Sequence, residues 1–86
     1  MYYYVYILVS DNRQKWSYVG QTDNIKRRLK EHNNGKVKST KALRPLRLIY
    51  TEKYYLREES LKREKYLKSG YGREEKQNII SYSGIV

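Results

Sequence analysis

The chain has 86 residues, of which 33% are charged and 38% are hydrophobic, and this length corresponds to one small domain. It contains no cysteine and only one histidine, which excludes disulfide frameworks, thiolate zinc sites, thiol nucleophiles and histidine-rich metal clusters. No apolar run approaches the roughly 20 residues of a membrane span, and the first residues lack the basic segment of a signal peptide. We therefore expect a single cytoplasmic domain over residues 1–86, with its core at about residues 2–80 and no contact with a membrane.

The formal net charge of +10 is concentrated in one part of the chain. Residues 24–47 carry nine basic side chains and one acidic side chain, whereas residues 1–23 are neutral overall and residues 48–86 carry a net charge of +2. A local positive patch is typical of proteins that bind nucleic acids, and the alternative is a basic surface that keeps the chain soluble. The candidate contacts to a DNA backbone are Arg27, Lys36, Lys38, Lys41 and Arg44.

The N-terminal half of the sequence predicts two strands and a helix. The continuous aromatic and β-branched run Tyr2–Val9 predicts a strand that is buried on both faces. A polar turn separates it from a second strand over Trp16–Thr22, in which Gly20 indicates a bulge or a close backbone approach. Either Asp23 or Asn24 then caps a helix of about ten residues.

The C-terminal half predicts one strand and two helices. After a basic loop over residues 36–44, the alternation of apolar residues predicts a third strand over Leu46–Tyr54. Helical patterns follow over Leu56–Ser69 and from Arg73 to about Ile80, and we expect the tail 81–86 to be frayed. The order β-β-α-β-α-α predicts an α+β domain in which helices cover a small sheet.

Three polar side chains fall on helical stripes that should face the core. In the first predicted helix, Arg28 and His32 share the stripe of Ile25 and Leu29. Both either reach solvent at the edge of the stripe or form a partly buried cationic site for a phosphate. In the second helix Glu64 lies on the apolar stripe, where a carboxylate needs a cation, a metal ion or hydrogen-bond donors. A structural ion pair and a Mg²⁺ ligand are both compatible with this position.

Tyrosine replaces phenylalanine throughout the chain, which has eleven tyrosines and no phenylalanine. Tyr4 and Tyr6 share one face of the first strand, and Tyr18 of the second strand is able to join them. Amphipathic core filling explains most of the tyrosines. One or two phenols beside Arg28 are candidates for proton transfer.

These residues together resemble the GIY-YIG nuclease superfamily. Tyr4-Val5-Tyr6 and Tyr18-Val19-Gly20 resemble its paired tripeptides, and Arg28 and His32 follow at the spacing of that family. The segment Leu61-Lys62-Arg63-Glu64 resembles the one that carries its metal-binding glutamate. The chain departs from the pattern by having Tyr4 in place of glycine and by having valine in place of isoleucine in both tripeptides.

The resemblance implies a three-stranded antiparallel sheet flanked by helices and the hydrolysis of DNA phosphodiester bonds with one Mg²⁺ or Mn²⁺ ion. It also implies a role for each residue. Tyr6 or Tyr18 would act as the general base or orient the attacking water, Arg28 would bind the scissile phosphate, and His32 would assist. Glu64 would hold the metal ion. Because an ordinary tyrosine has a pKa near 10, we expect Arg28 and the metal to lower the pKa of the base.

Two other interpretations are compatible with the sequence. The first is a catalytically inactive nucleic-acid-binding module of the same fold. The second is a small basic protein that docks onto RNA or a ribosomal partner, with Glu64 and Arg28 as a structural ion pair. The expected partner is DNA, with RNA as the alternative.

Overall fold

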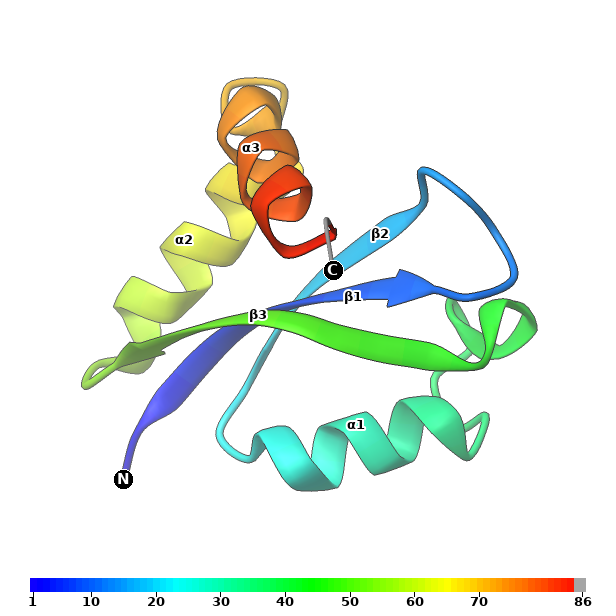
Figure 1. Cartoon of the computed structure of the whole chain (residues 1–86). Coiled ribbons are helices and arrows are strands. Elements are labelled where there is room, and N and C mark those ends of the chain that lie inside the picture. The colour runs from blue at the N-terminus through cyan, green and yellow to red at the C-terminus, as the bar shows by residue number, and fades with distance from the viewer. Residues whose placement is uncertain (85–86) are drawn as a thin grey trace.

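Strand β1 (Tyr3–Ser10) lies at the centre of the sheet. It pairs antiparallel with β2 (Ser17–Thr22) along one edge and with β3 (Leu46–Tyr54) along the other, which gives the strand order β2-β1-β3 (Figure 1). The computed structural model describes residues 1–84. The predicted three-stranded antiparallel sheet and the α+β class are confirmed, and the last two residues of the predicted frayed tail lie outside the described part.

Helices cover both faces of this sheet. Helix α1 (Ile25–Asn33) lies on one face, and α2 (Arg57–Lys68) and α3 (Arg73–Gly84) lie on the other (Figure 1). Helix α3 continues past its predicted end near Ile80, so residues 81–84 are helical rather than frayed, and Ile79 and Ile80 pack against the core. A short 3₁₀ turn, Lys41–Leu43, interrupts the basic loop. Within residues 1–84, no helix is long and apolar enough to cross a bilayer.

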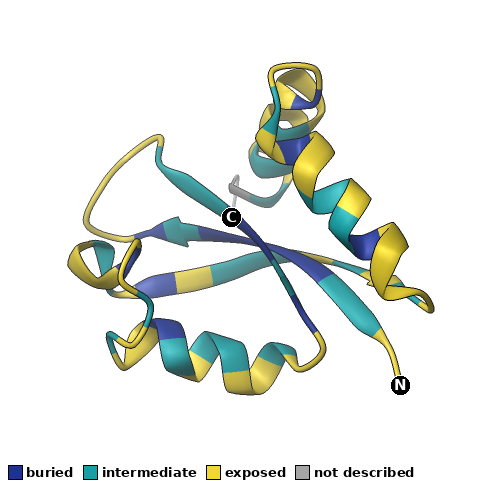
Figure 2. Ribbon diagram, turned by 180° about the vertical axis from the view of Figure 1, so that it is seen from behind, coloured by how far each residue is buried: buried dark blue, intermediate teal, exposed yellow. Residues whose placement is uncertain are grey.

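Strand β1 is buried on both faces, as the sequence predicts (Figure 2). Val5 and Ile7 point towards α2 and α3, where they form a cluster with Val19 and Leu67. Tyr6 and Leu8 point towards α1 and form a second cluster with Leu46. Because side chains alternate along a strand, β1 contributes to both cores. Each fully buried aliphatic side chain stabilises the fold by roughly 1.5–3 kcal/mol relative to exposure.

Both ends of α1 are held by side chains. Asn24 caps the N-terminus, since its side-chain oxygen accepts a hydrogen bond of 3.0 Å from the backbone N–H of Arg27. At the other end, the Asn33 amide donates to the Leu46 carbonyl at 3.1 Å and accepts from the Leu46 N–H at 2.8 Å. The last turn of α1 is therefore fastened to the start of β3, which fixes the helix under the sheet.

Arg63 of α2 is directed into the molecule rather than towards solvent. The Arg63 guanidinium turns towards the sheet and contacts Glu52 of β3, with Nε and Oε1 2.9 Å apart, and it also pairs with Glu75 of α3. Tyr50 and Tyr54 donate to the same Glu52 carboxylate. Burial alone would raise the pKa of Glu52, but these hydrogen bonds, led by that from Arg63, lower it. The network connects β3, α2 and α3. The helical pattern around Arg63 does not reveal this contact, because its partner Glu52 lies on a different element.

Gly20 of β2 lies directly opposite Tyr6 of β1. A Cβ atom at Gly20 would lie 2.3 Å from the Tyr6 hydroxyl oxygen and 2.4 Å from Cζ of its ring. The predicted close approach at Gly20 is thus confirmed, although what approaches is a side chain. The irregularity of the sheet lies elsewhere, between Ile7 and Leu8 in the pairing of β1 with β3.

We expect Gly20→Ala to lower the free energy of unfolding by about 1–3 kcal/mol, because the new methyl group displaces the Tyr6 ring from a packed site. Urea denaturation monitored by circular dichroism measures the change. Gly70→Ala is the matched control, since a Cβ atom there meets no atom within 4 Å. Equal losses of stability in the two variants would contradict the assigned packing of Tyr6 over Gly20.

Candidate active site

The Tyr6 hydroxyl group is the centre of a buried polar cluster. Its oxygen lies 2.8 Å from Nε2 of His32 and 3.4 Å from Nε of Arg28, both on α1. Tyr6 is 2% exposed and His32 is 0% exposed, so neither group exchanges hydrogen bonds freely with water. His32 is therefore buried and does not reach solvent at the edge of the α1 stripe, whereas Arg28 lies at the border with solvent.

Thr40 completes this cluster from the loop before β3. Its Oγ1 atom lies 2.8 Å from Nδ1 of His32, and its hydroxyl donates to the carbonyl of Val37 at 3.4 Å. A hydroxyl that donates to Val37 accepts from the N–H of Nδ1, which leaves Nε2 as the acceptor for the Tyr6 proton. The sequence analysis did not predict Thr40 as a site residue, because a threonine in a basic loop belongs to no helical or strand periodicity that would indicate burial. Thr40 is fully buried only because of the way the loop folds.

Burial controls the proton affinities in this cluster. Burial, reinforced by the charge of Arg28, lowers the pKa of His32 to about 4, so its imidazole is neutral at physiological pH. Burial also raises the pKa of Tyr6 to about 12, because it outweighs the hydrogen bond from Arg28. Arg28 lowers the pKa of Tyr6, as expected, but burial has the larger effect and the net shift is upward. The same hydrogen bond, together with one that Arg28 donates to Glu31, raises the pKa of Arg28 above its usual range.

Tyr18 stands beside this cluster on β2. Its ring centroid lies 5.1 Å from that of His32 and 6.2 Å from that of Tyr6. Trp16 stacks on the Tyr18 ring, with the two ring centroids 6.5 Å apart. The structure thus brings together Tyr6, Tyr18, Arg28 and His32, the four residues that the two tripeptides and the first helix contribute to the predicted site.

Glu64 reaches the same region from α2, across the β2 edge of the sheet. Its side chain is 20% exposed and accepts a hydrogen bond of 3.1 Å from Nζ of Lys68, which itself lies 5.6 Å from the centre of the Tyr18 ring. The negative charge of Glu64 contributes to the raised pKa of Tyr6, so the two groups interact electrostatically. Arg28 pairs with Glu31 at 3.1 Å. The hypothesis of a structural ion pair between Arg28 and Glu64 is therefore wrong.

Glu64 offers one carboxylate to a metal ion. Within residues 1–84, no group of three or more His, Cys, Asp or Glu side chains is arranged to hold a metal. Mg²⁺ commonly takes only one or two protein carboxylates and completes its octahedron with waters and substrate phosphates. Glu64 is partly exposed, and its partner Lys68 is half-exposed and able to move aside. A single carboxylate of this kind suits an ion that binds together with a phosphate.

A cleft opens next to this cluster, between the first turns of α1 and the ends of β2 and α2. It has a volume of about 290 Å³. Its lining residues are Tyr3, Gln21, Thr22, Asp23, Arg27, Arg28, Glu31 and Arg57. Arg28 lines the cleft and also contacts Tyr6, so one guanidinium joins the cleft to the buried hydroxyl.

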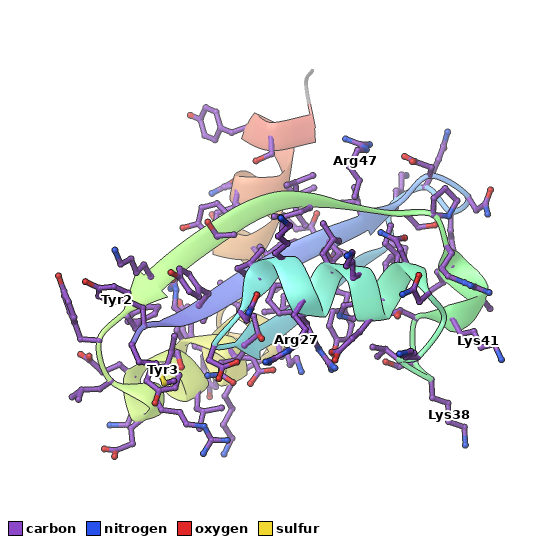
Figure 3. All side chains as sticks on the ribbon, turned by 90° about the horizontal axis from the view of Figure 1, so that it is seen from below. Tyr2, Tyr3, Arg27, Lys38, Lys41 and Arg47 are labelled. Atoms are coloured by element: carbon purple, nitrogen blue, oxygen red, sulfur yellow. The ribbon has the colours of Figure 1, made fainter. Side chains whose placement is uncertain are left out.

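The remaining predicted DNA contacts lie on the α1 side of the molecule. Arg27, Lys38 and Lys41 are exposed and follow one another along this face (Figure 3), and Lys36 is exposed as well. Arg27 is partly engaged, since it pairs with Asp23 at 2.7 Å. Arg44 differs from the lysines because its Nε donates to the Lys41 carbonyl at 2.8 Å and its guanidinium packs beside Gly35.

Comparison with known proteins agrees with the motifs. The GIY-YIG catalytic domain profile matches residues 2–78. A UPF0213 protein of Staphylococcus saprophyticus is 36% identical over 80 residues, which cover 92% of this chain and 94% of that protein. A UPF0213 protein of Syntrophus aciditrophicus is 43% identical over 79 residues, covering 90% and 87%. The solution structure of a UPF0213 protein from Bacillus halodurans, 33% identical, superposes with a TM-score of 0.57 over 98% of this chain and 88% of that one. The chain therefore belongs to the GIY-YIG catalytic domain family.

Proposed function

We propose that this protein is a metal-dependent DNA endonuclease that hydrolyses phosphodiester bonds. Membership of the GIY-YIG family supports a nuclease-type function. The observation that carries the proposal is the position of Arg28. It lines a cleft suited to a phosphate and hydrogen-bonds a phenol whose proton is in turn bonded to a buried neutral imidazole.

In this mechanism Arg28 binds the scissile phosphate. A guanidinium aimed at the nonbridging oxygens stabilises the charge that develops there as the nucleophile adds. Glu31, which pairs with Arg28 from the next turn of α1, holds the guanidinium in place. Arg27 is the neighbouring exposed cation and contributes to binding of the DNA backbone rather than to the chemical step.

The proton of the attacking water passes through the buried chain. Tyr6 is protonated at neutral pH and donates its hydrogen bond to Nε2 of His32. As the water oxygen attacks phosphorus and the bond from phosphorus to the 3′ oxygen breaks, Tyr6 takes the water proton and passes its own to Nε2 of His32. Because burial disfavours an imidazolium, His32 then returns this proton through Tyr6 to solvent, and the departing 3′ oxygen takes a proton from water. Thr40 keeps the imidazole in the tautomer that accepts this proton. Tyr18, which touches the same imidazole and is less buried, orients the water.

Glu64 would hold the Mg²⁺ or Mn²⁺ ion in this proposal. A divalent ion at this carboxylate would supply a Lewis acid for the charge on the departing 3′ oxygen. The second candidate function is a nucleic-acid-binding module without activity, and the raised pKa of Tyr6 favours it. Nicking of supercoiled plasmid DNA in Mg²⁺, compared with the same reaction in EDTA, separates the two functions.

We expect Glu64→Gln to abolish nicking and to leave DNA binding intact, because an amide is a poor ligand for Mg²⁺ despite its similar shape. Plasmid nicking and fluorescence anisotropy on a DNA duplex measure the two properties. Glu58→Gln, an exposed position of the same helix, is the control for loss of charge. Nicking by Glu64→Gln at the parent rate would show that the metal assignment is wrong.

We expect Arg28→Ala to lose roughly 10²–10³ in nicking rate, the typical effect of removing a donor aimed at a developing charge. Arg27→Ala, one position away and exposed, should weaken DNA binding with little effect on the rate at saturating enzyme. Single-turnover kinetics separate rate from binding. Equal rate losses in the two variants would assign the phosphate contact to both residues and refute the special role of Arg28.

We expect stability to fall by about 2 kcal/mol between pH 7 and pH 5, because of His32. The pKa of His32 is lowered from 6.5 to about 4 by folding, so below pH 6.5 the unfolded chain binds a proton that the folded chain excludes. The stability from neutral His32 is complete above pH 6.5 and is lost as the pH falls towards 4. Urea unfolding at several pH values measures the slope. His32→Gln should flatten it, and an unchanged slope would contradict the burial of a neutral imidazole.

A further inference from the structure

An aromatic ring lines the cleft that holds the three arginines. Tyr3, at the start of β1, is partly buried and shares the cleft wall with Arg27, Arg28 and Arg57. A site for a phosphate alone needs cations and hydrogen-bond donors but no aromatic surface. Cations next to a ring fit a nucleotide, whose phosphate contacts the cations while its base stacks on the ring.

The charges of the cleft favour an anionic ligand. Asp23 pairs with Arg27 at 2.7 Å, and Glu31 pairs with Arg28 at 3.1 Å. Within residues 1–84, no acidic side chain forms an ion pair with the third arginine, Arg57. The lining side chains therefore carry a net positive charge, and one guanidinium is free to bind a backbone phosphate.

A fixed amide lies on the same wall. The Nε2 atom of Gln21 donates at 3.0 Å to the hydroxyl of Ser60, a residue of α2 that is fully buried. This bond holds the side chain of Gln21 in one orientation at the cleft. A rigid polar group beside an aromatic ring suits contact with the edge of a stacked base.

Further exposed aromatic side chains continue the surface outside the cleft. Tyr2, adjacent to Tyr3 at the same end of the molecule (Figure 3), meets Tyr55 edge to face with ring centroids 5.2 Å apart. The ammonium group of Lys53 lies 3.8 Å from the centre of the Tyr2 ring. Tyr55 is 75% exposed. Stacking rings interleaved with cations are the features by which proteins bind single-stranded nucleic acid.

We propose that the cleft binds an unstacked nucleotide next to the scissile phosphate, with its base on the ring of Tyr3. In a fully paired duplex the face of each base is covered by its neighbours, so only an unpaired or extruded base can stack on a protein ring. The substrate class is therefore DNA that carries unpaired nucleotides beside the cleavage point. This inference rests on the proposed nuclease function, since Arg28 joins the cleft to Tyr6.

Binding in EDTA tests the subsite without cleavage. Fluorescence anisotropy compares a labelled hairpin that has a short single-stranded tail with a fully paired hairpin of equal length. We expect tighter binding of the tailed DNA. Tyr3→Ala should weaken binding of the tailed DNA by roughly tenfold and leave the paired DNA unchanged, since one base–aromatic stack contributes about 1–3 kcal/mol. A 2-aminopurine in the tail should be quenched by the parent protein and less so by Tyr3→Ala.

Three variants make the result specific to the ring. Tyr3→Phe should bind like the parent, and Tyr3→Leu, which preserves apolar packing without a ring, should behave like Tyr3→Ala. Tyr71→Ala, at a position that is 90% exposed and outside the cleft, should change nothing. Equal affinities of the parent protein for the two hairpins would overturn the proposal, as would a loss for Tyr3→Leu that is the same on both hairpins. If the protein bound the tailed hairpin more tightly in EDTA but did not nick DNA in Mg²⁺, the nuclease function would be refuted and the nucleotide subsite would still be supported.

Discussion

The hydroxyl group of Tyr6 is buried between β1 and α1, and a buried hydroxyl must be hydrogen-bonded to avoid a cost of about 1–3 kcal/mol. His32 meets this need, which explains a histidine on the core-facing stripe of α1. The residue opposite Tyr6 has to be a glycine, because the ring occupies the space of any Cβ atom there. Thr40 then satisfies the second nitrogen of the imidazole. The buried Tyr6 phenol thus restricts which residues are acceptable at positions 20, 32 and 40, which lie on three different segments of the chain.

The same burial determines the chemistry that the cluster can perform. A low-dielectric environment disfavours both a phenolate and an imidazolium, so Tyr6 and His32 remain neutral side by side. Neutral partners with one proton between them are suited to passing that proton along. Arg28 is a permanent charge in contact with the phenol, and it lies where the cluster opens to the cleft. A permanent charge therefore lies at the mouth of the cluster, and the neutral phenol and imidazole lie behind it.

Helix α2 brings Glu64 to the β2 edge because other residues hold the helix in place. Leu67 is fully buried in the cluster of Val5 and Ile7, and Arg63 is bonded to Glu52 of β3 and to Glu75 of α3. With these two neighbours directed into the molecule, Glu64 is left partly exposed at the rim. The network at Arg63 therefore positions a carboxylate that it does not touch.

Local patterns of the sequence were sufficient for the strands, for a helix cap at either Asp23 or Asn24, and for the grouping of Arg28 and His32 on one stripe, since these depend on alternation, capping and helical spacing. The structure decided the cap in favour of Asn24. The paired tripeptides identified the family. Long-range contacts decided the rest. Arg63 is directed inward because it pairs with Glu52 of β3. Thr40 contacts His32 because the loop before β3 folds over the imidazole. Burial raises the pKa of Tyr6, although Arg28 alone would lower it. The sequence determines the type of each residue and its neighbours along the chain. Desolvation and ion pairing between elements arise only when distant segments pack together.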